Sequence, residues 1–456
     1  MGRLFRERSL TPTAVAKACL ARLDAVNPLI NAVIARRDAA FLAEAAAATV
    51  RHARGQPLSA IDGIPISVKD SLLTSDLPTT WGTRGLQYHQ SEHDEAAVAR
   101  VRAAGSPCIG KTNVPEFAME GYTDNPLFGA TRNPWDRRLT PGGSSGGAVS
   151  SVACGITPLA VGQDGGGSIR RPASHAGLVG LKPSLGAVPR EHVFPSLMLD
   201  FEVIGPLTRT VADARLLFNV MRGPSPTDRL SMAAAFASAQ TQRAAPLHIL
   251  YVERFGAAPL DPQIAHSVGQ AADRLGELGH HIEKGPLPLD LDFFVEASPQ
   301  VGQIGLARMF DTHPNWESQA SQKYRDMADQ GRRLPAARLW QIVEQVARLR
   351  REAARLFANF DAIVLPSAAA LPWPVDQAYP QQIDGQEVGP RGHAIYTGWV
   401  NAAGLPGLAL PCTPSSEGLP IGMQVIGPYG ADDMLLDLGA QYEAAHPWAH
   451  RWPEIG

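Results

Sequence analysis

Apolar residues recur every three or four positions near the N-terminus of the chain, which is the spacing of a helix with one buried face. The recurring residues are Val15, Cys19, Leu23 and Val26. Thr11 precedes this run and is a suitable N-cap, and an alanine-rich segment at 39–48 favours helix further along. We therefore predict a mainly helical region over residues 11–60.

Beyond residue 60 the pattern changes to short apolar runs bounded by glycine and proline. Three of these runs, at 65–68, 108–109 and 159–161, predict strands. Segments with helical character lie beside them, at 95–104 and 147–153. Alternation of strands and helices in this way is typical of an α/β fold.

A second alternation occupies the C-terminal half of the chain. Its pattern predicts strands at 247–252, 281–283 and 362–365, and helices at 262–278 and 431–445. The α/β character therefore extends over the whole sequence.

Segment 297–360 is rich in Ala, Arg, Gln and Glu and has apolar residues at helical spacing. It predicts two or three helices, which could form a lid or a subdomain. Two apolar runs follow it, at 405–414 and 420–428. Because no repeat, charged tail or low-complexity linker divides the chain, we expect residues 1–456 to fold as a single domain.

The composition is that of a globular protein, since 45% of the 456 residues are hydrophobic and 19% are charged. Lys plus Arg (41) nearly balance Asp plus Glu (44), so a net charge of −3 gives no general attraction to nucleic acid or to an anionic membrane. The N-terminus lacks a signal peptide and no apolar run could span a bilayer, so we expect a cytoplasmic protein. Four widely separated cysteines, without metal-ligand spacing, predict reduced thiols and no metal site.

Two stretches rich in glycine and serine carry the candidate chemistry, TPGGSSGG at 140–147 and QDGGGSIRRPA at 163–173. An apolar helix and strand separate them, so both should lie at one edge of the sheet. The residues before Ser168 are Gly165, Gly166 and Gly167. Their N–H groups, with that of Ser168, can form an oxyanion hole, in which removing one donor commonly costs about 3–4 kcal/mol. Neither stretch ends in the G-K-[ST] of a phosphate-binding loop.

A serine nucleophile needs a base to take its proton. Lys69 ends the apolar run GIPISVKD, where burial would lower its pKa from about 10.4 and leave the amine neutral. His175 is the alternative base. A lone histidine after Ser168, with no G-x-S-x-G elbow, is weak support for a Ser–His–Asp triad.

The motifs GIPISVKD, TPGGSSGG and DGGGSIRRPA, in this order, closely resemble those of the amidase signature family, as do segments 111–136 and 404–428. The likeness runs over most of the chain. It implies that Lys69 deprotonates Ser144, which is held on a cis peptide, and that Ser144 relays the proton from Ser168. The three residues would then act as a Ser–Ser–Lys relay.

The resemblance also implies an α/β/α-layered single domain around a mixed, largely parallel central sheet, with no metal or organic cofactor. Asp164 and Arg170 look like the family's buried supports for the loop that carries the nucleophile. The chain starts within what should be the first helix, which leaves open whether a leading segment is missing.

The implied reaction is hydrolysis of a carbon–nitrogen bond in a linear, non-peptide amide, which gives a carboxylate and an amine or ammonia through an acyl-serine intermediate. The expected partner is a small-molecule amide, and a homodimer is a candidate assembly. The candidate substrate-binding residues are Phe117, Ala118, Tyr122 and Trp399. Three further aromatic residues could line an apolar acyl pocket, Trp81, Phe128 and Tyr396.

Some residues depart from the family's common pattern. Gln163 and Gly165 flank the aspartate before the oxyanion loop, and Gly165 is a variant associated with amides other than glutamine. The main alternative function is the glutaminase (A-type) subunit of a tRNA-dependent amidotransferase, which shares the relay. Glutaminases of this type place an aspartate seven residues before the position of Asn401, where this chain has Ala394. A non-catalytic relative is the third alternative, against which the intact relay residues argue.

Overall fold

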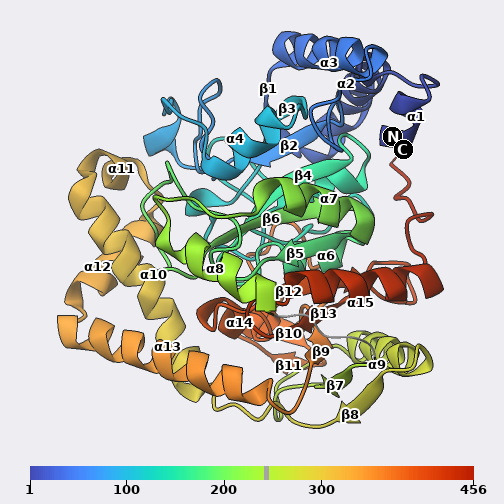
Figure 1. Ribbon diagram of the computed structural model, residues 1–456. Coiled ribbons are helices and arrows are strands. Elements are labelled where there is room, and N and C mark those ends of the chain that lie inside the picture. Colours follow the sequence, from blue (N-terminus) through green and yellow to red (C-terminus); the bar gives the residue numbers. More distant parts are fainter. Residues whose placement is uncertain (241–245, 456) are drawn as a thin grey trace.

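A mixed sheet of eleven strands forms the centre of the computed structural model, which describes residues 1–240 and 246–455 (Figure 1). The strands lie in the order β1-β3-β2-β4-β6-β5-β12-β13-β9-β7-β8. They are β1 (Val33–Arg36), β2 (Ile66–Lys69), β3 (Cys108–Thr112), β4 (Leu159–Asp164), β5 (Val179–Lys182), β6 (Val203–Thr208), β7 (His248–Tyr251), β8 (His281–Lys284), β9 (Ala362–Pro366), β12 (Gly407–Pro411) and β13 (Gly422–Ile426). A separate hairpin pairs β10 (Gln382–Ile383) with β11 (Gln386–Glu387).

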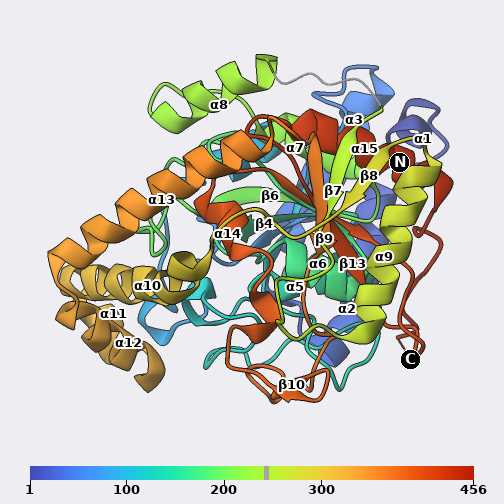
Figure 2. The same cartoon turned by 90° about the horizontal axis from the view of Figure 1, so that it is seen from below.

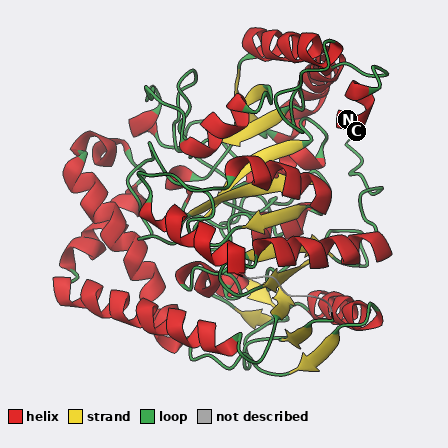
Figure 3. Ribbon diagram, in the orientation of Figure 1, coloured by secondary structure: helices red, strands yellow, loops and turns green. Residues whose placement is uncertain are grey.

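Helices surround this sheet (Figure 3). The α-helices are α1 (Gly2–Arg6), α2 (Pro12–Ile30), α3 (Asp38–Ala53), α4 (Ala96–Ala103), α5 (Gly146–Ala153), α6 (Arg170–Ala176), α7 (Val211–Met221), α8 (Arg229–Gln240), α9 (Pro262–Glu277), α10 (Asp292–Thr312), α11 (Pro314–Gln319), α12 (Gln322–Arg333), α13 (Ala336–Leu356), α14 (Gly398–Ala402) and α15 (Asp432–Ala445). Short 3₁₀ helices are η1 (Arg84–Leu86), η2 (Glu116–Ala118) and η3 (Gly392–Ala394).

The helices lie in two layers with the sheet between them (Figure 2). Helices α7 and α15 cover one face, and α5 and α6 cover the other. The helix α5 is buried along its whole length, as expected for the apolar segment between the two Gly-Ser stretches. The predicted α/β/α arrangement around a mixed sheet is therefore confirmed.

Parallel pairing occurs in two blocks of the sheet. Strand β2 runs parallel to β3 and β4, and β7 runs parallel to β8 and β9, with helical crossovers such as α5 and α9. From β4 through β6, β5, β12 and β13 to β9 the neighbours are antiparallel, and β1 is antiparallel to β3. The antiparallel middle includes direct connections such as the loop at 412–421 between β12 and β13, which need no crossover helix.

Most predicted elements are present within a few residues of their expected bounds. The region over 11–60 is an exception, because the edge strand β1 lies between its helices α2 and α3. Segment 297–360 contains four helices, α10 to α13, of which α10 starts at Asp292. This is more than the two or three predicted, because Pro314 starts α11 and Pro335 caps α13.

Helices α10 and α12 pack on a second apolar cluster, separate from the main core. Its largest members are Trp81, Phe117, Phe194, Phe310 and Tyr324. Phe117 belongs to η2 and contacts both Phe310 and Tyr324 edge-on. The helical segment is thereby fixed against the loops on the β2 and β3 side of the molecule (Figure 1).

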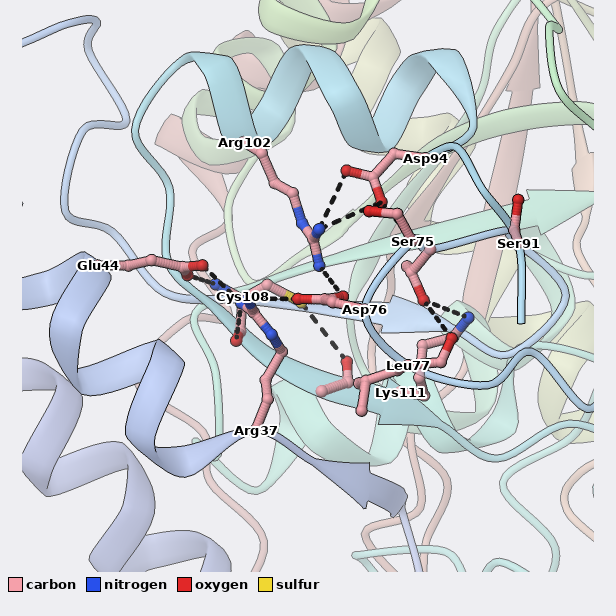
Figure 4. A network of polar contacts seen from close by, with 12 residues as sticks. Arg37, Glu44, Ser75, Asp76, Leu77, Ser91, Asp94, Arg102, Cys108 and Lys111 are labelled. Carbon is pink, nitrogen blue, oxygen red and sulfur yellow. Dashed lines mark hydrogen bonds and ion pairs between the residues drawn. The ribbon is translucent and has the colours of Figure 1, made fainter. Parts of the chain in front are cut away.

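A polar network lies at the start of β3, the strand next to the edge strand β1 (Figure 4). Arg37 and Arg102 both pair with Asp76, and Arg102 also pairs with Asp94 at 3.0 Å. Arg37 donates to the carbonyl of Cys108 at 3.1 Å, at the start of β3. The network therefore links α4 to the strand that pairs with β2.

No helix among residues 1–240 and 246–455 is long and apolar enough to cross a membrane. The four cysteines are buried and form no disulfide.

Candidate active site

Lys69 is the last residue of β2, a strand with a parallel neighbour on each side, and its side chain is 1% exposed. Its Nζ donates to Ser144 Oγ at 2.8 Å and to the backbone carbonyl of Gln163 at 3.0 Å. Burial lowers the pKa of Lys69 to about 7, although the negative charges of Asp164 and Glu202 oppose this shift. A substantial fraction of the amine is therefore neutral at neutral pH, as a base requires.

Ser144 lies in the loop that leads into α5, and the peptide bond between Gly143 and Ser144 is cis. This loop is packed too tightly for side chains at its glycines. A Cβ at Gly143 would lie 2.3 Å from the carbonyl oxygen of Tyr122, and one at Gly146 would lie 2.2 Å from Thr123 Oγ1. The glycines of TPGGSSGG therefore allow the backbone to bring Ser144 against the lysine.

Ser168 lies in the tight turn between β4 and α6, and Asp164 fixes this turn from beneath. Its carboxylate accepts from the N–H of Gly167 at 2.6 Å and of Ile169 at 3.0 Å, and it pairs with Arg170 at 3.1 Å. Burial alone would raise the pKa of Asp164, but Arg170 and these hydrogen bonds hold it well below its usual range. Asp164 and Arg170 thus support the loop structurally, as the sequence predicted.

Gly167 has a conformation that only glycine adopts readily, with φ of +120°. A Cβ there would lie 2.2 Å from Thr397 Oγ1. Because its N–H is bonded to Asp164, Gly167 is not free to donate to an oxyanion, in contrast to the prediction. The N–H groups of Gly166 and Ser168 donate to no atom of the described residues.

Lys69, Ser144 and Ser168 line one cavity of about 60 Å³. Gly165 and Gly166 lie in its wall beside them. The structure therefore brings the base, the two hydroxyls and the glycine loop together at one point. Such an arrangement could support acyl transfer to a serine, with a neutral amine in place of the usual imidazole.

The family model described as Amidase matches residues 14–436. This chain belongs to the amidase signature family. The A-type subunit of the glutamyl-tRNA(Gln) amidotransferase of Picosynechococcus sp. is 31% identical over 465 residues, which cover 95% of each chain. Acylamidase of Rhodococcus erythropolis is 30% identical over 475 residues, which cover 98% of this chain and 94% of that protein.

Solved structures of the same family have this fold. A 6-aminohexanoate cyclic dimer hydrolase complexed with substrate has a TM-score of 0.88 and 27% identity, covering 99% of this chain and 97% of that one. A bacterial aryl acylamidase has a TM-score of 0.88 and 28% identity, covering 98% of this chain and 96% of that one. The chain is therefore an amidase signature hydrolase of carbon–nitrogen bonds, while its relatives differ in the amides that their names state.

Three of the residues that the sequence predicted for the substrate pocket line the small cavity, Phe117, Ala118 and Trp81. Phe117 and Ala118 both have positive φ, 55° and 56°. Tyr122 is not in the wall, although its carbonyl lies behind the cis peptide. Trp399 is completely buried in the main core and lines neither this cavity nor its larger neighbour.

The remaining aromatic candidates, Phe128 and Tyr396, also lie outside the walls of these two cavities. His175 lies outside them too. It is buried, its Nε2 lies 3.2 Å from the carbonyl oxygen of Ala370, and burial lowers the pKa of His175 to about 4. These contacts identify it as a structural residue of α6 rather than as the alternative base.

Four charged residues in the wall of the small cavity were not predicted, Glu120, Arg171, Glu202 and Arg391. Glu202 and Arg171 line the cavity, and the side chain of Gln163 donates to Glu202 at 3.1 Å while accepting from Ser71 at 2.7 Å. Nothing in the sequence around Glu202 marks it as functional, whereas Arg171 lies within the GGSIRRPA motif. No group of three potential metal ligands occurs in the described part of the chain.

Proposed function

We propose that this hydrolase cleaves an amide by forming an acyl-enzyme on Ser168, with Ser144 and Lys69 as the proton relay. The observation that carries the proposal is the 2.8 Å hydrogen bond between Lys69 Nζ and Ser144 Oγ in the wall of the cavity that also contains Ser168. A neutral amine beside one hydroxyl can activate a second hydroxyl through it.

In the proposed reaction, Ser168 Oγ attacks the amide carbonyl and gives its proton to Ser144, which passes its own proton to Lys69. The tetrahedral oxyanion accepts hydrogen bonds from the N–H groups of Gly165, Gly166 and Ser168. Collapse of the intermediate breaks the carbon–nitrogen bond, and the amine leaves with the relayed proton. Water then attacks the ester by the same route and releases the carboxylate.

A double-mutant comparison tests the relay. Because the three groups act as one unit, Lys69→Ala and Ser168→Ala should each lower kcat/KM about 10³-fold or more, and the double variant should be little worse than the poorer single one. The exposed Lys17→Ala on α2 serves as the matched control and should leave kcat/KM unchanged. Losses that multiply in the double variant would contradict the relay.

We further propose that the natural substrate is a linear amide other than glutamine. At the position where the glutaminases of amidotransferases have an aspartate, Ala394 lies in the wall of a second cavity of about 530 Å³ next to the site. An alanine offers no charge to hold the ammonium group of glutamine. The glutaminase alternative remains relevant because the A-type subunits of amidotransferases are similar over nearly the whole chain.

Hydrolysis by the isolated chain distinguishes these functions. We expect kcat/KM for acetanilide or hexanamide to exceed that for glutamine by about 100-fold or more, because Ala394 cannot pair with the ammonium group of glutamine. A preference for glutamine, measured as ammonia release, would favour the amidotransferase function instead.

A further inference from the structure

The small catalytic cavity and its larger neighbour share part of their walls. The residues common to both are Gly165, Gly166, Arg171, Met198 and Arg391. Two guanidinium groups therefore lie at the junction, directly beside the glycine loop of the nucleophile. A substrate that extends from Ser168 into the 530 Å³ cavity must pass them.

Arg171 carries its charge in the protein interior, where its residue is only 3% exposed, and it forms no ion pair with a carboxylate of the described residues. Its Nη1 donates to the carbonyl of Gly166 at 2.9 Å and to Thr397 Oγ1 at 3.2 Å, and its buried Nε has no hydrogen-bond partner among the described residues. Burial and then repulsion from Arg391 lower the pKa of Arg171 to about 9. The group nevertheless remains a cation at neutral pH.

Arg391 is exposed at the same junction and is not paired with a carboxylate in the described parts of the chain. Its one hydrogen bond there is a long one, from Nη2 to the carbonyl of Met119 at 3.5 Å. Burial, followed by Arg171 and Arg391, lowers the pKa of the neighbouring His393 well below its usual range. Two positive charges therefore lie at this point, although the negative charges of Asp164 and Glu120 partly oppose the field at Arg171.

The two glutamates in the wall of the small cavity form ion pairs with other cations of the described residues, not with Arg171 or Arg391. Glu120 pairs with Lys323, and Glu202 pairs with Arg190 at 2.7 Å. Asp292 lines the large cavity but not the junction. The larger cavity also contains a third arginine, Arg254, which lies 3.5 Å from Glu253.

We infer that Arg171 and Arg391 form a subsite for a carboxylate of the substrate, so that this enzyme acts on amides that carry a carboxylate near the scissile bond. This inference rests on the proposed function. A guanidinium group donates paired hydrogen bonds that match a carboxylate, and one negative charge relieves the repulsion between the two arginines. Apolar side chains such as Phe255, Leu287 and Phe294 in the large cavity then accept the remainder of the molecule.

Two pairs of probes of equal shape test the subsite on either side of the scissile bond. On the acyl side, glutaryl 4-nitroanilide is compared with 5-methylhexanoyl 4-nitroanilide, in which an isopropyl group replaces the carboxylate. On the amine side, N-acetyl-4-aminobenzoate is compared with 4-isopropylacetanilide. We expect kcat/KM to favour the carboxylate in at least one pair by about 10- to 100-fold, mainly through KM.

Arg391→Gln should reduce this preference at least tenfold, Arg391→Lys should reduce it less because it keeps the charge, and added salt should weaken it. Arg351→Gln, an exposed arginine of α13 in neither cavity wall, is the matched control and should leave the preference unchanged. If neutral probes are cleaved with no preference in either pair, or if Arg391→Gln leaves the preference intact, the subsite is wrong while the proposed function stands. If no probe is cleaved, both fail.

Discussion

Lys69 lies within hydrogen-bond distance of a serine hydroxyl, and a substantial fraction of its amine is neutral at neutral pH. An ordinary, solvent-exposed lysine is almost entirely protonated at that pH. Burial is the cause, because the interior of the sheet cannot solvate the ammonium form as well as water does. The same burial has a direct consequence for the pH dependence of the reaction.

We predict that kcat/KM rises with pH and levels off above about 7, since burial lowers the pKa of Lys69 to about 7 and only the neutral amine accepts the relayed proton. Below that pKa the rate should fall about tenfold for each pH unit. The profile of the residual activity of Lys69→Ala should lack this limb. A wild-type limb centred near pH 4 would instead indicate His175, whose pKa burial lowers to about 4.

At Gly167 the side chain of alanine would meet both a strained backbone and a clash with Thr397. We predict that Gly167→Ala lowers kcat/KM at least 100-fold and destabilises the protein by about 2 kcal/mol or more. Steady-state kinetics and urea denaturation measure the two effects. Gly389→Ala is the matched control, because it has open space around it and an ordinary φ, and it should change neither quantity.

The sequence predicted the three relay residues, but not every contact that they and their neighbours make. The motifs predicted Lys69, Ser144 and Ser168, and the cavity contains all three. Local spacing could not show that the N–H of Gly167 is bonded to Asp164, or that Trp399 points into the core. The first is a local hydrogen bond across three residues that depends on the conformation of the turn, and the second depends on how α14 packs against the core.

At the scale of elements, the network around Arg102 holds α4 against the segment that connects β2 to α4 (Figure 4). Its side chain is 18% exposed and pairs with Asp76 at 2.6 Å and Asp94 at 3.0 Å. We predict that Arg102→Ala lowers the free energy of unfolding by about 1–2 kcal/mol, between the values typical of surface and buried pairs. The exposed Arg138→Ala, which breaks a local pair with Asp136, should have no measurable effect in the same denaturation experiment.

Elements with a strong pattern were predicted well, such as α9 with its buried face and β9 with five buried residues. The edge strand β1 was missed because its four residues, VIAR, do not alternate clearly and lie between two helices. Its pairing with β3 depends on contacts across about 75 residues of chain, which no local window contains. The number of helices in the 292–356 region was predicted too low. The helical spacing of apolar residues does not show where Pro314 and Pro335 begin new helices.

For the molecule as a whole, the fold places the relay between the parallel block at β2 and the antiparallel middle of the sheet, where β4 joins them. Segments near 117, 144, 168, 198 and 391 contribute to one cavity wall. The sequence predicted the class of reaction because its motifs are contiguous. The substrate subsite was not predicted, because Arg171 and Arg391 are 220 residues apart and meet only in the folded chain.

The central claim is that Ser168 is the nucleophile, and covalent labelling tests it most directly. The wild-type enzyme is treated with a serine-directed phosphonyl fluoride and digested, and the adduct is located by peptide mass spectrometry. We predict one adduct per chain, on Ser168, with loss of activity in proportion to labelling. An adduct on Ser144, Ser145 or another hydroxyl, or full inactivation with Ser168 unmodified, would contradict the account.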